Sequence, residues 1–491
     1  MRQHFVRLGK QTAVYGLGAV AAQLLGVITL PIYARVFAPS EYGVIEVITV
    51  GLAVLAIVVD FGLNSAAQRS YFDYTDDDAE KRRVVLSSSI GSSMTIATLL
   101  AVAVAAAREP ISVWLFGSDR HATTLLLAAA CIPANTLAGL VREVLRLRFR
   151  PWSYLTVSLI TGCVGTALSL TFVLAFGWGV NGVFAGTLAG CLIAGAYAVT
   201  VAHPYIGRRI SIPELRVMIA FGLPLVPVAI AMWMLQFVDR ILLTKLASLD
   251  EVGQYAVANR LSLALTMLVA AFGVAYSPFM LSLHAEDAPA ERMVRAQLLT
   301  YLTAGLVAVA VFFSVFAREI VGIMAPGFHR SYQSVALVCA GAAALGFCQI
   351  PMAGITISRR TKLFAYFSVA AAIVNVGLNF LLIPIWGQVG SAAATAVGYL
   401  LLALLYYWGA QHVARADFAT GKLISIAVLG AALAPVGLIS DHVLWLALLA
   451  KFAALGVLAI GLRVIGVIGP EELRELRALI GQGRNLRTVR A

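Results

Sequence analysis

The chain has 491 residues, of which 60% are apolar and 12% are charged, and its formal net charge is +12. A soluble globule of this length carries many more charged residues on its surface, so the composition excludes a water-soluble protein and predicts one that faces lipid. The excess of Lys and Arg is explained by membrane topology and by anionic lipid, and we expect no nucleic-acid partner.

The apolar residues fall into about fourteen runs that are separated by short polar joints. A helix needs roughly 20 apolar residues to cross a hydrocarbon core of about 30 Å. We therefore expect an all-α polytopic membrane protein. The predicted spans cover residues 12–36, 42–66, 84–107, 121–141, 153–176, 180–202, 215–238, 253–277, 297–317, 332–357, 363–384, 389–411, 422–440 and 443–465.

The polar joints between successive spans are alternately rich and poor in Lys and Arg. The joints on one face carry basic clusters such as Lys81-Arg82-Arg83 and Arg359-Arg360, whereas the opposite joints carry only isolated residues. Basic joints stay in the cytoplasm, so this asymmetry places both termini there and requires an even number of spans. We expect a multi-pass protein of the bacterial inner membrane.

Two motifs recur at nearly one offset. The stretch from Arg35 to Gly43 is echoed from Lys245 to Gly253, and Trp178-Gly179 with Thr187 is echoed by Trp386-Gly387 with Thr395. Duplicated bundles with a site between the halves are typical of secondary transporters. The predicted domains are two parallel six-helix bundles over residues 1–210 and 211–414, two extra transmembrane helices over 415–468, and an amphipathic cytoplasmic tail over 469–491.

The chain carries none of the sequence motifs that we associate with catalysis. It has no phosphate-binding loop and no His-Glu-x-x-His, and its five cysteines show no metal-ligand spacing. We expect no enzyme activity, no cofactor and no metal. Transport without covalent chemistry is the simpler interpretation.

Charged residues within spans are costly and indicate function. Arg260 is the sharpest case, because it lies about seven residues into its predicted span, roughly 10 Å below the outer boundary at 1.5 Å per residue. We interpret it as a substrate-binding residue. The alternative is an arginine that reaches the headgroups or pairs with Glu251 for structure alone.

Four further charged residues lie near the outer ends of spans and are candidate substrate-binding residues with Arg260. A cationic cleft lined by such groups suits an anionic group such as pyrophosphate. Solvated anchoring at the membrane surface is the alternative. These residues are Arg35, Asp239, Arg240 and Lys245.

Two acidic residues of the second span are candidates for ion coupling. Glu46 lies one turn inside the outer end and Asp60 near the inner end, and a buried carboxylate can carry a proton. The alternatives are an ion pair of Glu46 with Arg35 and a helix-end cap by Asp60. The sequence offers no partner for Lys451, which lies deep in the last span.

Three stretches of the chain together resemble a known family. They are Leu30-Pro31 through Gly43 with Gly62-Leu63, Gly222-Leu223-Pro224 with Asp239 to Leu242 and Val252 to Arg260, and Asn375 to Pro384 with Gly387, Gly390, Ala393 and Thr395. In this order they resemble the bacterial oligosaccharide flippases of the Wzx type, within the multidrug, oligosaccharidyl-lipid and polysaccharide exporter superfamily. The resemblance extends to about residue 410.

The resemblance implies a two-lobed bundle whose central cleft opens alternately to each face. It also implies a polyprenyl-pyrophosphate-linked oligosaccharide as substrate, flipped to the outer leaflet for surface polysaccharide synthesis, with membrane lipid and a polysaccharide polymerase as candidate partners. A cation-coupled multidrug antiporter, a membrane glycan polymerase or ligase and a structural scaffold are the alternatives. The motifs do not specify the glycan, and no clear ion site of the drug-exporting relatives is seen.

Overall fold

The computed structural model describes residues 24–74, 78–207, 209–439 and 444–467, and within these ranges the regular structure is helical throughout, with no β-strand. Among the described residues, thirteen helical stretches are long and apolar enough to cross a membrane. The shorter apolar helix Leu24–Val36 is the described part of the predicted span 12–36. The prediction of an all-α polytopic membrane protein is confirmed. The predicted tail over residues 469–491 lies outside the described residues.

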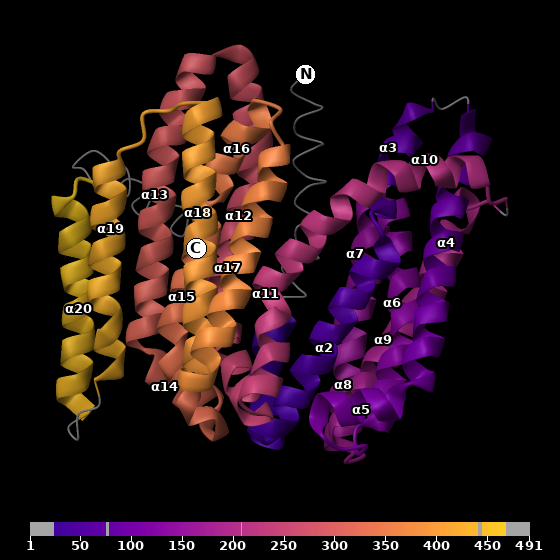
Figure 1. Cartoon of the computed structure of the whole chain (residues 1–491), viewed down its shortest axis with the longest axis horizontal. Helices are drawn as coiled ribbons and strands as arrows, with labels where there is room; N and C mark the ends of the chain where they lie inside the picture. The colour runs from indigo at the N-terminus through magenta and orange to yellow at the C-terminus, as the bar shows by residue number, and fades with distance from the viewer. Residues whose placement is uncertain (1–23, 75–77, 208, 440–443, 468–491) are drawn as a thin grey trace, which may run out of the picture.

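Two groups of helices form two lobes that lie side by side (Figure 1). The N-lobe contains α2 (Pro39–Asp60), α3 (Leu63–Asp73), α4 (Ala79–Ala106), α5 (Arg108–Phe116), α6 (Ala122–Leu147), α7 (Pro151–Leu159), α8 (Gly165–Leu174) and α9 (Gly179–Ala202). The C-lobe contains α12 (Leu249–Glu286), α13 (Ala288–Val315), α14 (Ala317–Met324), α15 (Tyr332–Phe347), α16 (Gln349–Ile357), α17 (Lys362–Trp386) and α18 (Gln388–Val413). Helices α10 (Ile212–Gly222) and α11 (Val226–Leu246) connect them.

The lobes meet at one end and stand apart at the other (Figure 1). We call the end where α2 and α12 begin the contact end, and the opposite end, which carries the basic clusters, the basic end. At the contact end, a Cβ added to Gly43 would lie 2.2 Å from the backbone oxygen of Leu249, and one added to Gly253 would lie 1.9 Å from that of Pro39. Only glycine permits so close an approach of α2 and α12.

The local sequence explains why α2 and α12 begin where they do. Pro39 occupies the first turn of α2, where its missing N–H is not needed, and the Glu41 carboxylate accepts from the Ala38 N–H at 3.0 Å. The Ser248 hydroxyl accepts from the Glu251 N–H at 3.2 Å at the start of α12. Both starts fall within the first echoed motif.

A second turn geometry also recurs. Phe149 and Arg359, 210 residues apart, each adopt a left-handed backbone conformation, with φ of 53° and 56°. In each case the next residue donates its N–H to the carbonyl five positions earlier, from Arg150 to Leu145 at 2.9 Å and from Arg360 to Ile355 at 3.3 Å. A left-handed residue followed by this hydrogen bond is a common way to end a helix at its C-terminus. The domain boundaries near residues 210 and 414 stay predictions.

Two helices that pass between the lobes are bent where they cross. The chain turns between α2 and α3 at Phe61 and Gly62, and a 3-10 turn, η4 (Leu223–Leu225), containing Pro224, separates α10 from α11. A Cβ on Gly62 would lie 2.5 Å from the backbone oxygen of Gly222, so the two bends pack directly on each other.

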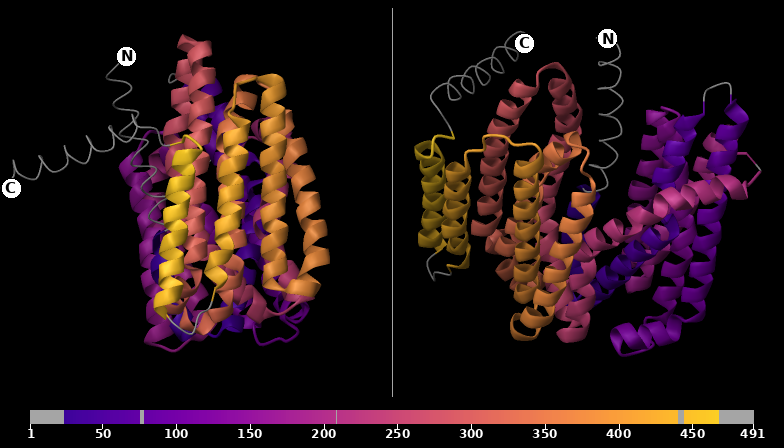
Figure 2. Two further views of the ribbon diagram at one scale, coloured as in Figure 1. Left: turned by 90° about the vertical axis from the view of Figure 1, so that its left-hand side faces the viewer. Right: turned by 45° about the horizontal axis from the view of Figure 1, so that its top comes forward.

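Helices α19 (Thr420–Leu433) and α20 (Leu444–Val464) lie on the flank of the C-lobe that faces away from the N-lobe (Figures 1 and 2). They pack on α13 through apolar side chains, and α20 also forms one ion pair with α14. The sequence offered no partner for Lys451. In the structure its ammonium group lies 2.5 Å from the carboxylate of Glu319 on α14, and the Lys451 side chain is only 1% exposed. The pair therefore ties α20 to the C-lobe.

Candidate functional site

Arg260 and Glu46 form an ion pair that joins the two lobes. The Nη2 atom of Arg260, on α12, lies 2.8 Å from Oε1 of Glu46, on α2. The side chains are 33% and 12% exposed, so the guanidinium group still has an accessible surface. A partly exposed guanidinium retains donors for a second anion.

Arg260 lies about three turns into α12. The helix begins at Leu249, eleven positions before Arg260, which corresponds to about 16 Å along the helix axis at 1.5 Å per residue. The predicted span began at residue 253, because Asp250 and Glu251 make the first turn of the helix polar. The depth of Arg260 below the membrane surface stays a prediction.

Glu46 and Arg260 do not have the partners that the alternative interpretations of the sequence gave them. Glu251 pairs with Arg330 at 2.7 Å and accepts from the backbone N–H of Gln388 at 2.7 Å, so it does not neutralise Arg260. Arg35 donates to the carbonyls of Pro31 and Ile323, and not to Glu46. The two alternative pairings, Arg260 with Glu251 and Glu46 with Arg35, are therefore wrong, and the functional roles of Arg260 and Glu46 stay predictions.

The helix Leu24–Val36 lies beside Arg260. A Cβ added to Gly26 would be 3.0 Å from Nη1 of Arg260, which leaves little room for a larger residue at position 26. Further along the same helix, Arg35 is exposed, and its bond to Ile323 at 3.2 Å reaches α14 of the C-lobe. Arg35 therefore lies at the contact end and bridges to the C-lobe there.

Asp239 and Arg240 form a closed cluster inside the C-lobe. Their side chains pair at 2.7 Å and are 1% and 8% exposed. The second carboxylate oxygen of Asp239 accepts from Tyr255 at 2.6 Å and from Thr395 at 3.2 Å. The Arg240 guanidinium also donates to the Gln236 carbonyl. Each charge of the pair is thus neutralised within the protein, and the cluster links α11, α12 and α18.

Sequence reasoning missed Tyr255 and Thr395 as members of this cluster. Both lie within the motifs described above. A hydroxyl group in an apolar span costs much less free energy than a charge, so it does not by itself indicate a functional residue. Their role becomes visible only when the fold places them on the Asp239 carboxylate.

Lys245 lies at the contact end, on the surface. Its ammonium group is 4.4 Å from the centre of the Trp114 ring, on α5 of the N-lobe, in a cation–π contact between the lobes. Asp60 lies at the other end of α2, where one carboxylate oxygen accepts from the Asn64 N–H at 3.2 Å. This bond is the helix-end cap that the sequence allowed as an alternative.

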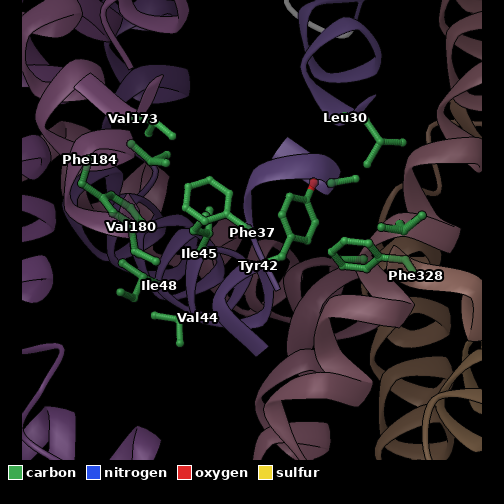
Figure 3. Close-up of a cluster of buried hydrophobic side chains, with 14 of the residues drawn as sticks. Leu30, Phe37, Tyr42, Val44, Ile45, Ile48, Val173, Val180, Phe184 and Phe328 are labelled. Carbon is green, nitrogen blue, oxygen red and sulfur yellow. The ribbon is translucent and has the colours of Figure 1, made fainter. Parts of the chain in front are cut away.

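An apolar cluster fills the contact end beyond Arg260 and Glu46 (Figure 3). It combines Leu30, Phe37 and Tyr42 with N-lobe residues and with Phe328 of the C-lobe, and Tyr42 meets Phe328 edge to face at 5.6 Å. These side chains are at most 4% exposed. Together with the packing of Gly43 and Gly253, the cluster closes the protein at this end.

The arrangement defines a polytopic transporter-like protein with a half-buried arginine, inside a candidate span, that pairs across the two lobes. Residues 8–284 match the family described as polysaccharide biosynthesis protein, which covers more than half of the chain, and the chain belongs to this family. It is 24% identical over 288 residues to the succinoglycan biosynthesis transport protein ExoT of Rhizobium meliloti (strain 1021). That match covers 56% of this chain and 55% of ExoT, so the chain spans about half the length of this curated relative.

Solved structures share the fold over most of the chain. The lipid II flippase MurJ, in an inward closed conformation, superposes with a TM-score of 0.73 at 15% identity, covering 92% of this chain and 99% of that one. An inward-facing multidrug resistance MATE family transporter of the MOP superfamily superposes with a TM-score of 0.65 at 14% identity, covering 79% and 94%. The chain therefore has the fold of these transporters.

Proposed function

We propose that the protein is a flippase that moves a polyprenyl-pyrophosphate-linked oligosaccharide across the bacterial inner membrane for surface polysaccharide synthesis. The observation that carries the proposal is Arg260, a half-buried cation inside a predicted span, paired across two lobes that meet at the contact end. The family, the relative ExoT and the MurJ-like fold support the same class of function.

The physical problem is to carry sugars and a charged pyrophosphate through hydrocarbon. Burying such groups without partners costs many kcal/mol, so a flippase must replace their water with fixed donors. A guanidinium group can offer two parallel hydrogen bonds to a phosphate group. Arg260 would hold the pyrophosphate, while the polyprenyl tail stays in lipid.

The basic end would face the cytoplasm. It carries the Lys and Arg clusters of the joints, which favour the cytoplasmic side, and the lobes stand apart there. The lipid-linked glycan would enter between the lobes from this side and meet Arg260 below the closed contact end. Separation of α2 from α12 at the contact end, with closure at the basic end, would then expose the glycan to the opposite face.

Glu46 would act as the resident counter-anion of Arg260. A pyrophosphate group that binds the guanidinium must displace the carboxylate, which would then lose its cationic partner. Substrate binding would thereby be linked to the ion-coupling role that we predict for Glu46. Asp60 would remain a second candidate at the basic end.

Complementation of a strain depleted of this protein tests the proposal. Arg260→Ala should abolish surface polysaccharide while the protein still accumulates in the membrane, and Arg260→Lys should restore it only in part, because lysine keeps the charge without the bidentate geometry. Arg330→Ala is the matched control, since Arg330 is an exposed arginine that also pairs with a glutamate of α12. Normal polysaccharide with Arg260→Ala would remove Arg260 from the site.

A further inference from the structure

A small cavity at the basic end of the N-lobe is lined by three arginines. We call it the arginine pocket. Its volume is about 30 Å³, whereas a single water needs roughly 10–15 Å³, so it has room for more than one oxygen atom. The pocket lies among the ends of α3, α4 and α6 and the turn η3 (His203–Tyr205). Its polar lining residues are Tyr71, Arg82, Arg83, Arg148 and Tyr205.

Two of these arginines are held in place by aromatic rings. The Arg82 guanidinium lies 4.7 Å from the centre of the Tyr71 ring, and that of Arg148 lies 4.5 Å from the centre of the Tyr205 ring. Arg148 also donates to the Tyr71 hydroxyl at 3.1 Å. Stacking fixes the planar guanidinium group and reduces the entropy that a ligand must remove, which is a common preparation for binding phosphate.

No carboxylate is among the described residues that line the pocket. Two carboxylates of the same end bind elsewhere: Glu143 pairs with Arg146 at 2.5 Å, and Glu214 accepts from Tyr74 at 2.7 Å. Two of the pocket arginines, Arg83 and Arg148, therefore have no carboxylate partner among the described residues, whereas the buried Arg295 at the basic end of the C-lobe is neutralised by Glu291 at 3.1 Å.

We propose that the arginine pocket binds a phosphate group, supplied by the headgroup of an anionic phospholipid of the cytoplasmic leaflet. Three arginines in one pocket favour an anion with several acceptor oxygens, and charge-assisted hydrogen bonds to phosphate are among the strongest in proteins. The basic end is the level at which anionic headgroups lie if this end is cytoplasmic. A pyrophosphate group carries the same chemistry, and the experiment separates the two sources.

Native mass spectrometry of the full-length protein in detergent is the test, with phosphatidylglycerol, phosphatidylcholine and inorganic pyrophosphate as separate probes. The double variant Arg83→Gln/Arg148→Gln removes two pocket charges. The control Lys81→Gln/Arg146→Gln removes two charges from α4 and α6 that lie two positions from Arg83 and Arg148 but outside the pocket lining. We expect wild type and control to retain phosphatidylglycerol over phosphatidylcholine, and the pocket variant to bind it at least tenfold more weakly.

Pyrophosphate binding with the same dependence on the pocket, without phosphatidylglycerol binding, would overturn the lipid source. Equal loss in the pocket and control variants, or no binding of either phosphate probe to wild type, would overturn the site itself. The single variant Arg83→Gln should not disturb the fold, because Arg83 is exposed and its side chain makes no ion pair or hydrogen bond among the described residues. Its affinity for phosphatidylglycerol should still fall several-fold. None of these outcomes depends on the proposed transport activity.

Discussion

Replacing Glu46 by glutamine should strengthen the binding of pyrophosphate to Arg260. The change removes the negative charge that now lies 2.8 Å from the guanidinium group, but keeps the size of the side chain and a hydrogen-bond acceptor. Two unit charges about 4 Å apart attract by roughly 1 kcal/mol in water and 4 kcal/mol at an effective dielectric constant of 20. Because Arg260 is one-third exposed, solvent screens the pair, and we expect a gain of about 1–2 kcal/mol.

This gain corresponds to an affinity for pyrophosphate that is roughly 5 to 30 times higher in Glu46→Gln than in wild type. Isothermal titration of the purified protein with inorganic pyrophosphate measures it directly. Glu251→Gln is the matched control, because Glu251 pairs with Arg330 and should leave the affinity unchanged. An unchanged or weaker affinity in Glu46→Gln would refute the view that Glu46 competes with the substrate for Arg260.

Three other substitutions test how the fold is held together. Asp239→Ala leaves Arg240 buried without its carboxylate and should lower the free energy of unfolding by about 3–5 kcal/mol, measured by thermal unfolding in detergent. Gly253→Ala places a methyl group against the α2 backbone and should increase spin-label distances across the contact end, whereas Gly305→Ala, in open space, should not. Lys451→Ala removes the only described ion pair of α20 and should cost about 2 kcal/mol, with faster proteolysis of α19 and α20.

The opposite results would identify which contact has been misjudged. A stable Asp239→Ala protein would mean that water or another group satisfies Arg240, which the buried cluster does not allow. Unchanged spin-label distances in Gly253→Ala would mean that the contact end does not depend on the close contact between the backbones of α2 and α12. Unchanged proteolysis in Lys451→Ala would mean that apolar packing alone holds α20.

The sequence predicts the helices and their number well because each span depends on local composition. A run of about 20 apolar residues is readable without knowledge of its neighbours, and a charge inside such a run stands out by its cost. Arg260 and Lys451 were found in this way. The starts of α2 and α12 are likewise signalled by Pro39 and Ser248 at their first turns.

The partners of these charges could not be predicted, because they lie far apart in the chain. Glu46 and Arg260 are separated by 214 positions, and Lys451 and Glu319 by 132. The internal echo does not help, since an offset of 210 aligns Glu46 with Ala256 instead of with a charged residue. Pairing across the lobes is a property of how the helices pack, which the sequence pattern alone does not specify.

The most direct test of the proposed function is to locate the lipid-linked glycans in cells depleted of the protein. The glycans are extracted and identified by mass, and a membrane-impermeant sugar oxidant reports which leaflet they occupy. We predict that a complete oligosaccharide on its polyprenyl carrier accumulates in the cytoplasmic leaflet, protected from the oxidant, and that wild type but not Arg260→Ala restores its exposure. Glycans that reach the outer leaflet normally without the protein would contradict the proposal that it is their flippase.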